Sequence, residues 1–175
     1  RKKERERNKA FKSEKIQEAL KRINFKTKIP TEEYNRMDLN QILVRDDFRI
    51  DLFHKSVCRG FSLSDSMKKR ANKIIEFKHL NVSLVSIEDV FLFKTFTERE
   101  GDIEDCISLS KKGMDWDVIL DELKSQIKDS GKKIWITWIG ERLEILEERG
   151  LIIPIMKEIK KLYQEYIDEY GRKHS

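Results

Sequence analysis

The stretch that decides the fold is residues 82–94, VSLVSIEDVFLFK, because the hydrophobic period of the chain changes inside it. Residues 82–85 form a short β-prone run of the kind that builds a strand. Ser86 is followed three residues later by Asp89, which is the capping-box pattern of a helix start. Strand patterns dominate before Ser86, and helical patterns dominate after it.

Two pairs of strands are predicted around this point and upstream of it. Residues 41–44 and 48–53 flank the turn candidate Asp46-Asp47, and the second run alternates apolar with polar side chains, which predicts a hairpin. Residues 74–77 and 82–85 are predicted to pair in the same way, because only a short connection separates them.

One helix is predicted on each side of the first hairpin. The first covers residues 4–23 and carries an apolar stripe at helical spacing, made of Ile16, Ala19, Leu20 and Ile23. The second covers residues 64–70, with Ser64 as its N-cap.

Helices fill the rest of the chain, and glycines, cations and capping acids mark their ends. The first is predicted to run from Ser86 to about Glu100, with Gly101 ending it and Asp102 capping the next. Further boundaries are predicted at Lys111-Lys112-Gly113, Asp115, Ser130-Gly131, Gly150 and Pro154. This order predicts the α+β class, with a small mixed β-sheet from about residues 40–54 and 73–85 followed by a C-terminal helical bundle.

The chain is unusually charged, and its net charge is local. Charged residues make up 39% of the sequence, against roughly 25% in an ordinary soluble protein, which indicates solvated helix surfaces. Residues 1–12 hold seven basic and two acidic side chains, so they account for the net charge of +5. This basic stretch predicts a weak nucleic-acid contact, and a solvated helix start is the alternative.

Cysteine and histidine usage argues against a disulfide framework or a zinc site. Cys58 and Cys106 lie far apart, which favours a reducing compartment. The three histidines have no ligand spacing. With no apolar run of about 20 residues and no signal peptide, we expect a cytoplasmic protein that does not contact a membrane.

Asp51 is the first candidate for chemistry. It lies within an apolar run but on the alternate strand face, where a carboxylate would be held rigidly. Mg²⁺ prefers such hard oxygen ligands, and phosphoryl or nucleotidyl transfer uses them. The alternative is a surface aspartate that pairs across the hairpin or with Arg49.

Lys94 is the second candidate, because it lies on the packed face of the helix after Ser86. A covered lysine needs a carboxylate, a phosphate or a path for its ammonium group to reach solvent. Residues 98–105 are dense in both charge signs. The alternative to a phosphate site is therefore a salt-bridge network that fixes the angle between two helices.

The order of these motifs resembles a prokaryotic and archaeal nucleotidyltransferase family of the DNA-polymerase-beta-like fold, related to abortive-infection toxins. The resemblance covers roughly residues 14–125. It is carried by the strand around Asp51, the helix at residues 64–71, the run at residues 84–94 that ends in Lys94, the segment at residues 99–105 and the sequence Gly113-Met114-Asp115-Trp116.

The resemblance implies a metal-dependent enzyme that transfers a nucleoside monophosphate from an NTP to a hydroxyl of RNA or protein. It implies a partial nucleotidyltransferase-like domain over residues 1–100 and a helical region over residues 101–175. Asp51 would hold Mg²⁺, and Asp51 and Lys94 would be catalytic. The nucleotide would be contacted by Lys94, Arg99, Asp102 and Asp105. An antitoxin or a second copy of the chain is the partner implied.

The chain departs from this family in the region where the metal-binding pair is expected. The family's Gly-Ser helix start and Asp-x-Asp strand should precede residue 14, but residues 1–12 contain neither aspartate nor glycine. Either that portion lies outside this chain or the protein is a degenerate version. We therefore expect the chain to be inactive and to hold no Mg²⁺ by itself. The alternative function is a non-catalytic module that binds protein or nucleic acid.

Overall fold

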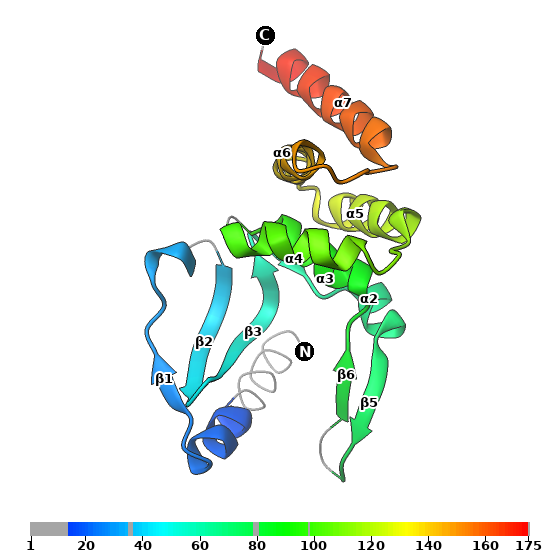
Figure 1. Cartoon of the computed structure of the whole chain (residues 1–175). Coiled ribbons are helices and arrows are strands. Elements are labelled where there is room, and N and C mark those ends of the chain that lie inside the picture. The colour runs from blue at the N-terminus through cyan, green and yellow to red at the C-terminus, as the bar shows by residue number, and fades with distance from the viewer. Residues whose placement is uncertain (1–13, 35–36, 79–80, 98, 175) are drawn as a thin grey trace. The chain divides into compact units, whose positions relative to one another are not determined.

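The computed structural model of the chain describes residues 14–34, 37–78, 81–97 and 99–174 (Figure 1). The chain divides into two compact units, Arg1–Ser62 and Leu63–Ser175, here called the sheet unit and the helical unit. This division falls at residue 62, whereas the predicted boundary is at residue 100. The basic stretch at residues 1–12 and the first part of the helix predicted at residues 4–23 lie outside the described residues.

The sheet unit contains a four-stranded antiparallel sheet in the order β1-β2-β3-β4. Its described elements are a helical segment at residues 14–22, β1 Lys26–Lys28, a 3-10 turn at Glu32–Tyr34, β2 Met37–Arg45, β3 Phe48–Cys58 and β4 Phe61–Ser62. The predicted hairpin is confirmed, because Arg45 pairs with Phe48 across the turn at Asp46 and Asp47.

The helical unit begins with a small helix and a second hairpin. These are α2 Asp65–Arg70, β5 Asn72–Glu76 and β6 Asn81–Leu84. β5 pairs antiparallel with β6, which confirms the predicted pairing, but the two strands form a sheet of their own.

The described strands therefore make two antiparallel sheets, and the expectation of a single mixed sheet is corrected. Alternation of apolar and polar side chains determines which face of a strand is buried. A short turn pairs the two strands that it joins. Neither signal says whether two hairpins distant in the sequence share one sheet.

Further helices complete the described part of this unit: α3 Ile87–Thr95, α4 Glu100–Ser110, α5 Trp116–Ser130, α6 Trp135–Glu148 and α7 Met156–His174. Three of the predicted N-caps are confirmed. The Ser64 hydroxyl accepts the Met67 N–H, the Ser86 hydroxyl accepts the Asp89 N–H, and the Asp115 carboxylate accepts two N–H groups at the start of α5.

The predicted junction between α3 and α4 is wrong by several residues. α3 ends at Thr95 and not near Glu100, and both Gly101 and Asp102 lie inside the first turn of α4. A glycine signals a helix end only where the backbone takes a positive φ, and Gly101 does not. Asp102 does not cap α4, since its carboxylate binds side chains of the preceding segment.

α3 is the central helix of the unit, because it packs against α4, α5 and α6. Its side chains Phe91 and Leu92, together with Phe96 at its C-cap, are at most 2% exposed. Phe91 meets the ring of Trp116 edge-on at 5.3 Å between centroids, and Phe96 meets Trp135 at 5.7 Å. α7 is joined to this core through α6.

The glycine that ends α5 gives a matched test of these boundaries. Gly131 has a φ of 70° and donates its N–H to Ile127 O, whereas Gly101 is helical and an added methyl group would meet nothing within 4 Å. We expect Gly131→Ala to destabilise the protein by about 1–2 kcal/mol, because alanine is strained in the left-handed region. Gly101→Ala should stabilise it by up to about 1 kcal/mol. Urea denaturation of both variants measures the difference, and equal effects would contradict the assigned helix ends.

Candidate functional site

Asp51 lies on β3 of the sheet unit, opposite Ile42 of β2. Both of its carboxylate oxygens accept hydrogen bonds from Arg49, with distances of 2.7 Å from Nε and 3.0 Å from Nη2. Arg49 also donates to the Tyr34 hydroxyl at 2.7 Å. The hydrogen bond with Asp51 raises the pKa of Arg49 despite the opposing effect of partial burial. The alternative in which Asp51 pairs with Arg49 therefore matches the observed geometry.

This arrangement does not fit a magnesium site within the described residues. Asp51 brings one carboxylate, and a guanidinium group already binds both of its oxygens. Mg²⁺ would have to displace that cation and find further oxygen ligands in octahedral geometry. No group of three or more histidine, cysteine, aspartate or glutamate side chains in the described part of the chain is placed to hold a metal ion.

Lys94, Arg99, Asp102 and Asp105 are brought together at the junction of α3 and α4. The Lys94 ammonium group lies 2.9 Å from Asp102 Oδ1 and 2.5 Å from Asp105 Oδ2. Arg99 donates from Nε to Asp102 Oδ2 at 2.8 Å and from Nη2 to Oδ1 at 2.9 Å. The predicted need of Lys94 for an anionic partner is thus met by acids of its own unit.

Asp102 is the centre of this network and is 3% exposed. The Thr97 hydroxyl also donates to Asp102 Oδ2, and Arg142 of α6 donates to the Thr97 carbonyl oxygen. Burial raises the pKa of Asp102, but the hydrogen bonds from Arg99, Thr97 and Lys94 outweigh it, and the net pKa is below the ordinary value. Asp102 is therefore ionised at neutral pH, with two cations and a hydroxyl as its donors.

A second buried ionic cluster, which was not predicted from the sequence, joins α2, α3 and α5. Arg70 Nη2 lies 2.6 Å from Asp89 Oδ1 and 2.7 Å from Glu122 Oε2. Gln126 donates to the other oxygen of Glu122 at 2.9 Å. Glu122 could have been found from the sequence, because it lies at helical spacing among Ile119, Leu123 and Gln126 on the packed face of α5.

Cys106 is a chemically reactive residue type whose surroundings make it inert. It is 1% exposed, and burial raises the pKa of its thiol to about 12. Since the thiolate is the nucleophilic form, Cys106 stays protonated at neutral pH and belongs to the core.

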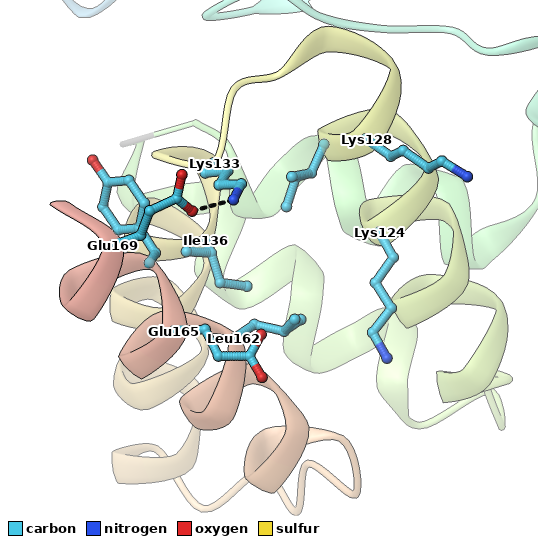
Figure 2. A pocket seen from close by; sticks show the side chains of 9 residues that line it. Lys124, Lys128, Lys133, Ile136, Leu162, Glu165 and Glu169 are labelled. Carbon is cyan, nitrogen blue, oxygen red and sulfur yellow. Dashed lines mark hydrogen bonds and ion pairs between the residues drawn. The ribbon is translucent and has the colours of Figure 1, made fainter. Parts of the chain in front are cut away.

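An open cavity of about 300 Å³ lies between α5, α6 and α7 (Figure 2). Its wall combines apolar side chains from all three helices, Ile127, Ile136, Leu162 and Tyr166, with a charged rim, Lys124, Lys128, Lys133, Glu165 and Glu169. Figure 2 shows Lys133 of the α5–α6 connection and Glu169 of α7 joined by an ion pair at one side of the cavity. Lys124 pairs with Glu158 at 3.2 Å.

A second hollow of about 320 Å³ shares Lys133, Tyr166 and Glu169 with the first. It adds Lys132, Ile134, Tyr170 and Lys173. We call the two together the α5–α7 groove, and its lining holds five lysines but only two glutamates. Hydrogen bonds from Lys133 and Lys173 lower the pKa of Glu169 to about 2, so this acid remains charged.

The groove could not be found from the sequence. Each helix shows an ordinary amphipathic pattern, and a lysine beside an apolar stripe is common on solvated helices. The hollow exists only because α7 leaves part of α5 and α6 uncovered, and this depends on how the three helices pack.

No protein-family model, no curated protein and no solved structure matches this chain, so no relative assigns a role to these residues. None of the helices in the described part of the chain is both long and apolar enough to span a membrane.

Replacing Lys94 tests whether the α3–α4 network stabilises the fold. Lys94→Met keeps the apolar stem and removes the charge. We expect a loss of about 1–3 kcal/mol in the free energy of unfolding, because the buried Asp102 loses one of its cations.

The control for Lys94 is Lys68→Met, which breaks the exposed Lys68–Asp65 pair of 2.8 Å and should change stability by less than about 0.5 kcal/mol. Chemical denaturation followed by circular dichroism measures both variants. An unchanged or raised stability in Lys94→Met would contradict the structural role and favour a phosphate-binding one.

Proposed function

We propose that this chain is a non-catalytic binding module whose binding site is the α5–α7 groove. The observation that carries the proposal is the composition of the groove, which has an apolar floor and a rim with an excess of lysines. Sites that bind partners or ligands are typically concave and apolar, with a few polar groups that fix orientation.

The lining of the groove suits a ligand with an apolar body and an anionic group. Side chains such as Ile127, Ile136 and Leu162 would cover the apolar part. Lysine ammonium groups on their long stems can reach an anion at the rim. The cavity of about 300 Å³ admits one large side chain or a small aromatic molecule, since ligand pockets begin near this size.

The candidate catalytic residues support a binding role through their pairing. Asp51 is bound by Arg49, and Lys94 is bound by Asp102 and Asp105. Charged side chains that are already paired within the protein contribute little to binding a nucleotide or a metal ion unless their ion pairs break. In the groove, Lys124 pairs with Glu158, and Lys133 and Lys173 pair with Glu169, but these pairs lie on a partly exposed rim. Exposed ion pairs are weak, so a ligand can replace them at little cost.

The resemblance to nucleotidyltransferases supports a second proposal. In a complete enzyme of that type, Asp51 would act as one Mg²⁺ ligand beside an Asp-x-Asp pair, and Lys94 would steady the nucleotide phosphates. What favours it is the location of Asp51 on a strand of the four-stranded sheet, with its side chain 22% exposed. Nucleoside monophosphate transfer from an NTP to RNA or protein is the reaction proposed for that enzyme.

The fluorescent dye 1-anilinonaphthalene-8-sulfonate tests the groove, because it combines an aromatic body with a sulfonate and brightens in apolar surroundings. We expect saturable binding to the full chain. Lys124→Glu combined with Lys128→Glu should weaken it about tenfold, which corresponds to about 1.4 kcal/mol, since both reversals repel the sulfonate.

Two further variants make this measurement specific. Leu162→Gln removes apolar lining and should also weaken binding of the dye. Lys111→Glu combined with Lys112→Glu makes the same charge change just after α4, away from the groove lining, and should leave binding unchanged. If all variants bind the dye equally, the groove is not a binding site.

The catalytic proposal has its own test in the 175-residue chain. We expect no transfer of labelled nucleotide from any NTP, because one paired carboxylate cannot hold the two metal ions that in-line transfer uses. Transfer by the purified chain that disappears in Asp51→Asn would contradict this expectation and establish the enzyme.

A further inference from the structure

α6 carries several charges that oppose its own macrodipole. Lys132 and Lys133 immediately precede the helix, and its first turn contains no acid. Its last turn contains Glu147 and Glu148, and the C-cap residue Arg149 pairs with Glu104 of α4 at 2.9 Å. A helix N-terminus favours negative charge and a C-terminus favours positive charge, so the two lysines and the two glutamates oppose the macrodipole and Arg149 suits it.

The glutamates of α6 also form a ridge on its solvent side. Glu141, Glu144 and Glu148 recur at helical spacing and are all exposed, and Ile145 lies among them at 36% exposure. None of these three carboxylates makes an ion pair or a side-chain hydrogen bond to another described residue. Unpaired like charges three and four residues apart repel each other. We call these four residues the α6 ridge.

The α6 ridge and the α5–α7 groove are complementary in both charge and polarity. The ridge presents an isoleucine surrounded by three carboxylates. The groove presents an apolar floor with five lysines against two glutamates around it. An amphipathic helix that lays an apolar anchor into a groove is a common recognition mode, and charges around the anchor set its register.

We propose that the occupant of the α5–α7 groove is the α6 ridge of a second copy of this chain. This inference rests on the proposed function of the groove as a binding site. Contact with lysines of another copy would neutralise glutamates that lack partners within the described part of their own unit. It would also place a positive charge near the C-terminal end of α6, where the macrodipole favours it.

The contact is heterologous, because the ridge and the groove are different surfaces of one unit. Each copy therefore offers its ridge to one neighbour and its groove to another. Such contacts close into a ring or extend as an open chain of subunits. Association should weaken as salt is raised, since exposed ion pairs are screened.

Sedimentation velocity of the full chain over a range of concentrations and salt tests the proposal. A ridge variant reverses the acids by Glu141→Lys, Glu144→Lys and Glu148→Lys. A groove variant removes two cations by Lys124→Ser and Lys128→Ser. We expect concentration-dependent association of the wild type and at least about tenfold weaker association of each variant alone.

Mixing the two variants gives the decisive measurement. The groove variant keeps an intact ridge and the ridge variant keeps an intact groove, so one contact remains and a 1:1 complex should form. Neither the ridge variant nor the groove variant should form a dimer with itself. At a dilution where the wild type is monomeric, so that association does not contribute to stability, the melting temperature of the ridge variant should rise, because Glu148→Lys near the C-terminal end of α6 suits its macrodipole. This excludes loss of association through unfolding.

The outcomes separate this inference from the function on which it rests. Dye binding in the groove without self-association at any concentration would overturn the second copy as occupant and leave the binding site in place. Failure of dye binding would overturn both. Self-association that survives in both variants, or a mixture that gives no 1:1 complex, would overturn the pairing of ridge and groove. A ridge variant that melts below the wild type when both are monomeric would contradict the unfavourable position of Glu148 in α6.

Discussion

The helical unit depends on one constraint, which is that the central helix α3 packs against three other helices and yet carries charge. Asp89 is 1% exposed, and the Lys94 side chain is 24% exposed. A charge removed from water is costly unless it is paired and hydrogen-bonded. α2 and α5 supply Arg70 and Glu122 around Asp89, and α4 supplies Asp102 and Asp105 to Lys94. The same ionic groups therefore link the helices that cover α3.

This constraint bears directly on function. Lysine and acidic residues at motif spacing are expected at a nucleotide site, but the same spacing also places them where two packed helices meet. Here the acids and cations at residues 94–105 bind each other. The ion pairs of Lys124 and Lys133 beside the groove have more exposed side chains than the pair of Lys94 with Asp102.

Much of the local structure was predictable from particular residues. Ser64, Ser86 and Asp115 cap helices, and Asp46-Asp47 turns a hairpin, because each of these signals acts through hydrogen bonds within a few residues. The prediction that Gly101 ends a helix was wrong, since a glycine marks a helix end only if its backbone is left-handed there. The requirement that Lys94 have a partner was predictable from its place on the packed face of α3.

Local sequence patterns were enough to predict the order of strands and helices, most of their boundaries and the existence of covered charges that need partners. These properties depend on hydrophobic period, caps and turns, which act over a few neighbouring residues. Three features became visible only in the folded chain: the two hairpins form separate sheets, Asp102 and Asp105 bind Lys94, and three helices leave a groove beside Lys124 and Lys128. These properties depend on how side chains far apart in the sequence interdigitate when helices and strands pack, and no local pattern specifies that geometry.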